Sequence, residues 1–301
     1  MRETIRKLFY EAGATAVGFA RAGETDSDFH SLFAKWVEEG KHGEMEYLRR
    51  HVPLRASTES VLPEASTVIS VAYNYSPENF RSEELPCISA YSYGEDYHTV
   101  LREKLQPVVK GLSTSFGGKW RICIDSAPVS ERYWALKSGI GISGKNGSVI
   151  IEGCGCFSFL VEVLTTLEIA PDEPSLKKCK GCGKCIEVCP SKALSEDGLD
   201  ASRCINYLTI EKKGEFSDEE KELLQSGRGY LFGCDRCLKV CPHNNEKRVG
   251  ILENFNLKDE IKNLSPLAIL NMDEEEFKRR FSRSPLLYAG YERLRRNASI
   301  F

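Results

Sequence analysis

Cysteine is the residue type whose spacing in this sequence points most directly to chemistry. Residues 179–190 follow the pattern Cys-x2-Cys-x2-Cys-x3-Cys-Pro. This is the bacterial ferredoxin spacing, in which three cysteines bind one 4Fe–4S cluster and the fourth binds a second cluster. Glycines at positions 181 and 183 free the backbone to wrap around a cluster. The spacing therefore predicts an iron–sulfur site that passes single electrons.

A second motif repeats the end of the first. Residues 234–242 read Cys-x2-Cys-x3-Cys-Pro, and Cys204 can supply the first cysteine that this run lacks. Because the fourth cysteine of such a run binds the other cluster, the ligands are expected to interleave. We assign one cluster to Cys179, Cys182, Cys185 and Cys241, and the other to Cys189, Cys204, Cys234 and Cys237.

Two other uses of the cysteines are weaker. Zinc in all-thiolate sites is possible in principle, but paired runs that end in Cys-Pro are unusual for zinc. Disulfides are disfavoured because no secretion signal begins the chain, so we expect a reducing, cytoplasmic compartment. Four cysteines have no ligand spacing and are expected to be buried structural thiols, namely Cys87, Cys123, Cys154 and Cys156.

The elements that must position these residues fall into three predicted parts. Residues 1–170 read as a mixed α/β catalytic domain, and a proline- and acid-rich linker follows it. Residues 171–250 read as a ferredoxin-like domain with two 4Fe–4S clusters, and residues 251–301 as a short helical tail. The expected fold class is α+β.

Hydrophobic periodicity places several elements within the first part. An amphipathic helix begins near residue 1, and further helices are predicted at 28–39 and 98–113. Strands are predicted at 16–20 and 68–75, with shorter apolar runs at 121–124 and 149–151. The run at 121–124 ends in Asp125, and strand ends are where active-site groups often emerge.

Composition excludes several classes of protein. The chain has 301 residues, 41% of them apolar and 28% charged, with a net charge of -3, as in an ordinary soluble globular protein. It has no run of about 18 apolar residues that could span a membrane. Any nucleic-acid contact must be local, because the overall charge offers no polyanion-binding surface.

Familiar cofactor motifs are missing or incomplete. No Gly-x-Gly-x-x-Gly or Walker loop occurs, so nicotinamide and nucleoside triphosphates are not supported. Asp96-Tyr97-His98 begins like the Asp-x-His-x-x-Gly signature of cobalamin proteins, but Leu101 stands in place of the glycine. A histidine-ligated cobalamin is therefore not indicated.

Several segments, in order along the chain, resemble the bacterial epoxyqueuosine reductase family. They are Tyr-Gly-Glu-Asp-Tyr-His at 93–98, Arg-Ile-Cys-Ile-Asp-Ser-Ala-Pro-Val-Ser-Glu-Arg at 121–132, Gly-Ile-Ser-Gly-Lys-Asn at 141–146, Ser-Arg-Cys-Ile-Asn-Tyr-Leu-Thr-Ile-Glu at 202–211 and Phe-Gly-Cys-Asp at 232–235. The similarity extends over nearly the whole chain. Larger family members continue into a helical-repeat extension, so this chain resembles a short form.

The resemblance implies an oxidoreductase of tRNA modification. The family reduces the epoxide of epoxyqueuosine, at the wobble position of tRNA, to queuosine in the last step of queuosine biosynthesis. It uses cobalamin bound base-off, without an axial histidine, and reduced through the two clusters. The first domain would then be a cobalamin-binding catalytic domain. The implied partners are tRNA and a reductant of the flavodoxin or ferredoxin type, and we expect a monomer that contacts no membrane.

Asp125 is the catalytic residue that the resemblance implies. An alkoxide is a poor leaving group near neutral pH, so a group must protonate the departing epoxide oxygen. An ordinary aspartate, with a pKa of ~3.9, would be ionised. We therefore expect burial against the corrin ring to raise the pKa of Asp125. The alternative is that Asp125 is only a helix N-cap before Pro128 and Glu131.

The resemblance also implies residues that contact cofactor and substrate. The positions expected to approach cobalamin are Arg55, Asp125, Val149, Leu160, Asn206, Cys234 and Asp235. The positions expected to contact substrate are Tyr97, His98, Lys212 and Lys213. On their own, His98 would more often be a structural histidine and the two lysines a solvated pair. The basic residues between 278 and 296 could assist in binding tRNA.

Two other functions compete with this one. A corrinoid reductive dehalogenase would share clusters and cobalamin but act on organohalides, and it usually carries an export signal that this chain lacks. A two-cluster electron-transfer protein would have the clusters and no catalytic cofactor.

Overall fold

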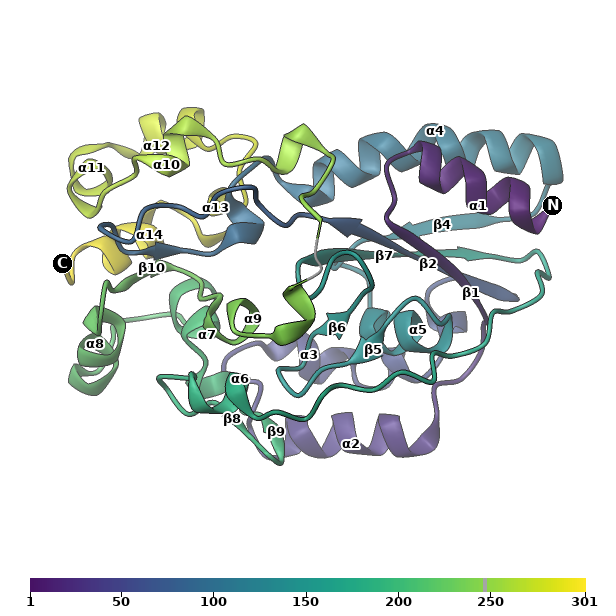
Figure 1. Cartoon of the computed structure of the whole chain (residues 1–301), viewed down its shortest axis with the longest axis horizontal. Helices are drawn as coiled ribbons and strands as arrows, with labels where there is room; N and C mark the ends of the chain where they lie inside the picture. The colour runs from purple at the N-terminus through teal and green to yellow at the C-terminus, as the bar shows by residue number, and fades with distance from the viewer. Residues whose placement is uncertain (246–247) are drawn as a thin grey trace.

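A four-stranded antiparallel sheet forms the centre of the molecule in the computed structural model, which describes residues 1–245 and 248–301 (Figure 1). Its strand order is β1-β2-β7-β4. The strands are β1 (Ala16–Arg21), β2 (Thr67–Asn74), β7 (Ser158–Thr165) and β4 (Trp120–Cys123). Every residue of β2 is buried, which is why this segment reads as an almost continuous apolar run.

The two faces of the sheet are covered by different helices. Helices α1 (Arg2–Glu11) and α4 (Tyr97–Phe116) cover one face, and α5 (Glu131–Lys137) packs on the other, with α2 (Ser27–Glu38) beyond it (Figure 1). Side chains alternate along β7, so Val161 and Val163 join the core on the α1 and α4 side. Glu162 and Leu164 therefore point to the α5 side.

Most of the predicted elements are present. The expected strands at 16–20 and 68–75 are β1 and β2, and the expected helices at 28–39 and 98–113 lie within one to three residues of α2 and α4. The run at 149–151 contributes β6 (Val149–Ile150), which pairs with β5 (Ile142–Ser143). The central strand β7 was not predicted.

Short elements frame the cysteine motifs. Helices α6 (Lys184–Glu187) and α9 (Arg236–Lys239) each start inside a motif, and the two pack against each other. The segment between the motifs forms a hairpin of β8 (Leu194–Ser195) and β9 (Gly198–Leu199), then α7 (Ile205–Ile210) and α8 (Asp218–Gln225). The α+β class is confirmed.

The cysteine-rich part is joined to the sheet domain by paired strands. Strand β10 (Tyr230–Phe232) runs parallel to β3 (Cys87–Ile88), which precedes α4. This pairing sets the second cysteine motif beside the segment that leads to α4. Helix α3 (Glu46–His51) and the 3-10 turn Leu54–Ala56 lie between α2 and β2 along the chain.

The C-terminal residues pack on the rest of the molecule. They form α10 (Asp259–Lys262), α11 (Pro266–Asn271), α12 (Glu274–Arg280), α13 (Leu286–Ala289) and α14 (Tyr291–Ala298). Phe255, Phe277 and Phe281 belong to the same apolar core as Phe9 and Tyr93. The tail thus shares a core with the first domain, and the division at residues 170 and 250 remains a prediction. No helix among the described residues is long and apolar enough to cross a bilayer.

Candidate active site

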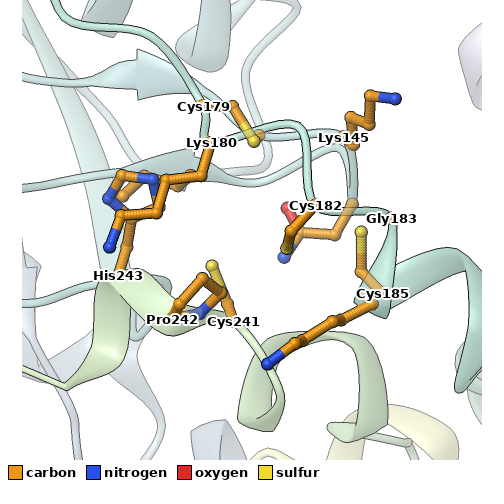
Figure 2. A pocket seen from close by; sticks show the side chains of 13 residues that line it. Lys145, Cys179, Lys180, Cys182, Gly183, Cys185, Cys241, Pro242 and His243 are labelled. Carbon is orange, nitrogen blue, oxygen red and sulfur yellow. The ribbon is translucent and has the colours of Figure 1, made fainter.

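Four of the predicted cluster ligands line one hollow. Cys179 and Cys182 lie in the loop that enters α6, Cys185 lies within α6, and Cys241 follows α9 (Figure 2). The hollow encloses ≈ 330 Å³, open solvent included. A ligand from the second motif therefore meets three from the first.

The other four predicted ligands are also neighbours. Burial raises the pKa of the Cys237 thiol, and Cys204 and Cys189 add to the shift. Burial likewise raises the pKa of Cys234, with Cys237 among its charged neighbours. Thiols in such surroundings ionise when a nearby metal charge compensates for lost hydration. In the described ranges, no three His, Cys, Asp or Glu side chains are grouped to hold a single metal ion.

The remaining cysteines are buried, as predicted, but two of them lie beside the candidate ligands. Cys156 packs in one apolar group with Cys179 and Cys241, and the Asn146 amide lies 3.5 Å from its sulfur. Cys87 packs in the group that contains Cys204 and Cys234. Sequence spacing gave no sign of this proximity, because it depends on how β3 and the segment after β6 fold back.

Asp125 lies just after the end of β4, in a turn exposed to solvent. Its side chain is 61% exposed, and its backbone has φ +54°. The Tyr97 hydroxyl donates to Asp125 Oδ2 at 2.9 Å, and His98 Nε2 lies 3.5 Å from the same oxygen. Tyr97 and His98 open α4, so the start of this helix and the end of β4 bring the three predicted residues together.

His98 bridges two carboxylates. Its Nδ1 lies 2.9 Å from Asp96 Oδ1, and the same oxygen accepts the His98 backbone N–H, which caps α4. Burial would lower the pKa of His98, but its hydrogen bonds to Asp125 and Asp96 raise it to about 9. The imidazole therefore has a structural anchor and is also a charged member of the site.

The pKa of Asp125 moves opposite to the prediction. Partial loss of water to the surrounding protein atoms would raise it, but hydrogen bonds from His98 and Tyr97 and the positive charges of His98 and Arg132 outweigh this and lower the pKa below its ordinary value. The expected rise depends on burial against a corrin ring, so for the protein with cobalamin bound it stays a prediction. The carboxylate has donors on Oδ2 and is largely exposed, so its charged form is well stabilised.

Asp125 is not a helix N-cap. Ser130 occupies that position, and α5 begins at Glu131. The Glu131 carboxyl instead reaches back to the turn, where Oε1 accepts the Asp125 backbone N–H at 2.5 Å. Burial and the charge of Asp125 raise the pKa of Glu131, while Arg55 and Arg132 lower it. Glu131 was part of a recognised segment, but its contact with the turn was not foreseen.

Arg55 faces the same cluster of charges. Burial lowers its pKa, and Glu131 and Asp125 raise it. Its Nε is buried and has no hydrogen-bond partner in the described part of the chain. The guanidinium carbon lies 5.5 Å from the centre of the Phe33 ring. Arg55 thus lies near Asp125 with a donor still available, and its predicted contact with cobalamin stays a prediction.

Aromatic side chains form a rigid support for the site. Tyr97 stacks on Phe159 with ring centres 4.3 Å apart and planes at 7°, and Phe159 packs on Tyr75 at 4.4 Å. On the other side of the sheet, Val149 and Leu160 belong to one apolar group. The two predicted aliphatic positions therefore lie together, but not on the Tyr97 face.

The second cysteine motif is hydrogen-bonded to the segment before α4. Asp235 is 2% exposed, and its carboxylate accepts from the Ser89 hydroxyl and from the Ala90 N–H at 2.7 Å. A Cβ on Gly233 would lie 2.9 Å from Asn206 Oδ1, so the Asn206 side chain packs closely against the Gly233 backbone. Burial and the negative charges of Asp235 and Asp125 raise the pKa of Tyr91. Residues 89–91 thus connect the motif with the Asp125 turn.

The two predicted tRNA-binding lysines differ. Lys212 forms an ion pair with Glu220 at 3.0 Å and is only 21% exposed, whereas Lys213 is exposed. The basic tail is also engaged internally, because Arg296 donates to the carbonyls of Lys212 and Gly214. Part of the predicted basic surface is therefore occupied by contacts within the chain.

An open hollow that sequence reasoning missed adjoins the Asp125 turn. It encloses ≈ 1670 Å³, open solvent included, and lies between α4, β4 and residues 126–128. Four cations line it, namely Arg102, Lys110, Lys119 and Arg121. Their positions are scattered in the sequence, so only the packing of α4 beside β4 collects them.

Comparison with known proteins places the cysteine-rich part in a defined class. A family model described as "4Fe-4S double cluster binding domain" matches residues 178–244. That range contains all eight predicted ligands. The fold and the site together define an iron–sulfur oxidoreductase, in which a double-cluster module is joined to a carboxylate–histidine site.

The same comparisons identify the family. The model "Epoxyqueuosine reductase QueG, DUF1730" matches residues 55–126. An epoxyqueuosine reductase of Cyclobacterium marinum is 34% identical over 98% of this chain and 94% of its own. The crystal structure of an epoxyqueuosine reductase with an epoxyqueuosine-modified tRNA-Tyr stem loop matches at TM-score 0.88 and 27% identity, over 99% of this chain and 80% of that chain. The chain belongs to the epoxyqueuosine reductase family.

A further solved structure is also similar to this chain. A Bacillus subtilis epoxyqueuosine reductase, solved with its catalytic aspartate loop swung out of the active site, matches at TM-score 0.86 and 27% identity. The match covers 99% of this chain and 80% of that chain.

Proposed function

We propose that this protein reduces the epoxide of epoxyqueuosine in tRNA to the alkene of queuosine. The observation that carries the proposal is membership of the epoxyqueuosine reductase family over nearly the whole chain. Family membership favours this reaction over reductive dehalogenation and over electron transfer alone. In the reaction both epoxide C–O bonds break and a C=C bond forms. The oxygen leaves as water, which requires two electrons and two protons.

The two clusters deliver the electrons. We assign Cys179, Cys182, Cys185 and Cys241 to one cluster, and Cys189, Cys204, Cys234 and Cys237 to the other. The grouping of four of these thiols around one hollow supports the assignment. Electrons then reach the site through the second motif, which Asp235 ties to residues 89–91.

Cobalamin is the cofactor we propose between the cluster motif and the Asp125 turn. The residues there fit a large ring with polar side chains, because Arg55 Nε is buried without a partner and Asn206 is exposed beside Gly233. When bound, cobalamin would supply the electrons to the epoxide carbon. Val149 and Leu160 are proposed as apolar contacts, while Cys234 and Asp235 would approach from the cluster side.

Of the two protons that reach the epoxide oxygen, one comes from His98 through Asp125 and the other comes from solvent water. Because the pKa of His98 is raised to about 9, its imidazole is protonated at neutral pH. Asp125, with its lowered pKa, accepts this proton as the oxygen gains negative charge and passes it on. Tyr97 orients Asp125 through its hydroxyl group.

For tRNA, we propose phosphate contacts on two surfaces. Lys213 is exposed near the end of α7, and Lys212 is the weaker candidate because Glu220 pairs with it. The hollow beside the Asp125 turn offers further cations, among them Arg102 and Lys110. Basic side chains near the reacting nucleoside would hold the RNA backbone with a salt-dependent affinity. We further propose a cytoplasmic monomer served by a flavodoxin- or ferredoxin-type reductant.

Anaerobic reconstitution tests the function. The protein is loaded with iron, sulfide and cobalamin, and nucleosides from epoxyqueuosine-containing tRNA are then analysed by mass spectrometry. We expect queuosine to form, and we expect Asp125→Asn to lower kcat by about 100-fold or more, since it removes a proton-transfer group. Affinity for the tRNA stem loop should stay within about twofold, because the change leaves the phosphate-binding cations in place.

The controls separate this reaction from its rivals. Glu152→Gln, an exposed change outside the site, should retain full turnover. Turnover of a halogenated phenol but not of epoxyqueuosine would support a dehalogenase. Cluster absorbance without cobalamin uptake would support an electron-transfer protein.

A further inference from the structure

The turn that carries Asp125 has a strained backbone. Its φ of +54° lies in the left-handed region, which residues other than glycine rarely adopt. Such a conformation persists where surrounding contacts over-determine it. The Asp125 side chain is held by Tyr97 and His98, but its backbone N–H is held by Glu131 alone among the described hydrogen bonds.

We propose that Glu131 is a positioning residue, whose carboxyl group fixes the left-handed backbone of Asp125 and thereby aims the Asp125 carboxylate at Tyr97 and His98. The Glu131 Oε1 to Asp125 N distance is 2.5 Å. The consequence for turnover rests on the function proposed above. The consequence for the turn itself depends only on the geometry.

Glu131 lies on a helix that is packed firmly against the sheet. It is the first residue of α5, and the next turns of that helix are pinned to the sheet by Trp134 and Ala135, both buried. A carboxyl group on this helix end is therefore fixed relative to β4, the strand that leads into the turn. Precise placement of a reacting group depends on such fixed supports.

The charges around Glu131 also favour its reach toward the turn. Behind it, on β7, lies Glu162, which is 0% exposed and whose oxygens have no hydrogen-bond partner in the described structure. Burial, and next the Glu131 carboxyl group, raise the pKa of Glu162 well above its ordinary value. On the site side, Arg55 and Arg132 attract Glu131. The guanidinium groups on the site side therefore favour the orientation of the Glu131 carboxyl group toward the turn and away from the sheet.

Hydrogen exchange of the loaded protein tests the contact directly. In Glu131→Ala, the amide of Asp125 should exchange about tenfold faster, because its acceptor is lost. A peptide covering residues 158–165 of β7 should exchange as in the wild type. Glu131→Gln keeps an oxygen acceptor and should restore most of the protection, which a purely electrostatic role of Glu131 would not allow.

Turnover provides the second readout. Glu131→Ala should lower kcat for epoxyqueuosine tRNA by about 10- to 100-fold with KM within about twofold, since only the reacting group is displaced. Glu131→Gln should recover to within about fivefold of wild type. The matched control is Glu274→Ala, which also removes the first residue's carboxyl from a seven-residue helix, α12, and should change neither quantity.

Two outcomes overturn the proposal. One is unchanged exchange of the Asp125 amide in Glu131→Ala, and the other is a glutamine variant as impaired as the alanine variant. If the wild-type protein does not reduce epoxyqueuosine at all, the proposed function fails, while the exchange comparison still decides the role of Glu131.

Discussion

At the scale of single residues, the site depends on one imidazole shared between two carboxylates. His98 lies between Asp96 and Asp125, and this raises its pKa from the ordinary 6.5 to about 9. The stabilisation that its charge gives to the fold is fully present below pH 6.5 and is lost as pH rises through about 9. The same proton is the one that we propose for catalysis.

A pH profile checks this role of His98. For the wild type, we expect kcat to be level near neutral pH and to fall as pH rises through about 9, where His98 loses its proton. His98→Asn should be slower by about 10- to 100-fold and should lack that alkaline limb. His30→Asn, a change away from Asp125, is the control and should keep the wild-type profile. An unchanged alkaline limb in His98→Asn would assign the titration to another group.

Sequence identified these residues but not their electrostatics. Tyr97, His98 and Asp125 were recognised from family motifs, and the structure brings them together across 28 positions of sequence. The direction of the Asp125 pKa could not be derived, because it depends on whether donors or burial prevail. That balance is set by where α4 starts relative to the end of β4.

At the scale of elements, the packing of α5 on the sheet determines where the Asp125 turn lies. A Cβ on Gly18 of β1 would lie 2.1 Å from the Ser138 carbonyl oxygen, just after α5. Helix and strand therefore touch through their backbones. Patterning predicted β1 and β2 because their apolar runs lie between turn residues. It missed β7, whose apolar run carries Glu162, a residue that strands seldom bury.

Two glycine substitutions test how closely α5 packs against the sheet. Gly18→Ala should lower the free energy of unfolding by about 1–3 kcal/mol, because the added methyl group overpacks the contact with α5. Gly111→Ala, in the middle of α4, meets nothing within 4 Å and should raise it by about 0.5–1 kcal/mol. Guanidinium denaturation of the cluster-loaded protein, followed by circular dichroism, measures both. A Gly18→Ala protein as stable as the wild type would mean that α5 can shift freely.

At the scale of the whole molecule, segments far apart in sequence cross between the parts. Strand β10 of the cysteine-rich part pairs with β3 of the sheet domain, and tail residues such as Phe255 join the core of Phe9. Sequence spacing could assign ligands to two clusters, because ferredoxin motifs are local and regular. It could not show that Cys156 lies beside Cys241, since β-sheet and loop packing determine that proximity.

If the two motifs exchange their last ligands, cysteines from different motifs share one cluster. Substituting either of two such cysteines should then disturb the same cluster. Cys241→Ala should disturb the same cluster as Cys179→Ala, although Cys241 belongs to the other motif. Cys189→Ala should likewise match Cys234→Ala. Electron paramagnetic resonance of the reduced proteins, with iron analysis, measures this, and total iron should fall from about eight toward about four per chain in each variant.

The comparison of cysteine variants needs a control for the neighbouring Cys156 thiol. Because Cys156 packs beside Cys179 and Cys241, it could replace a lost ligand, so Cys241→Ala is measured both alone and with Cys156→Ser. Cys154→Ala, at a buried thiol of a different apolar group, should keep both cluster signals. If Cys241→Ala instead matches Cys234→Ala, each motif binds its own cluster. The chain crossing at α6 and α9 would then be a packing contact and not a shared metal site.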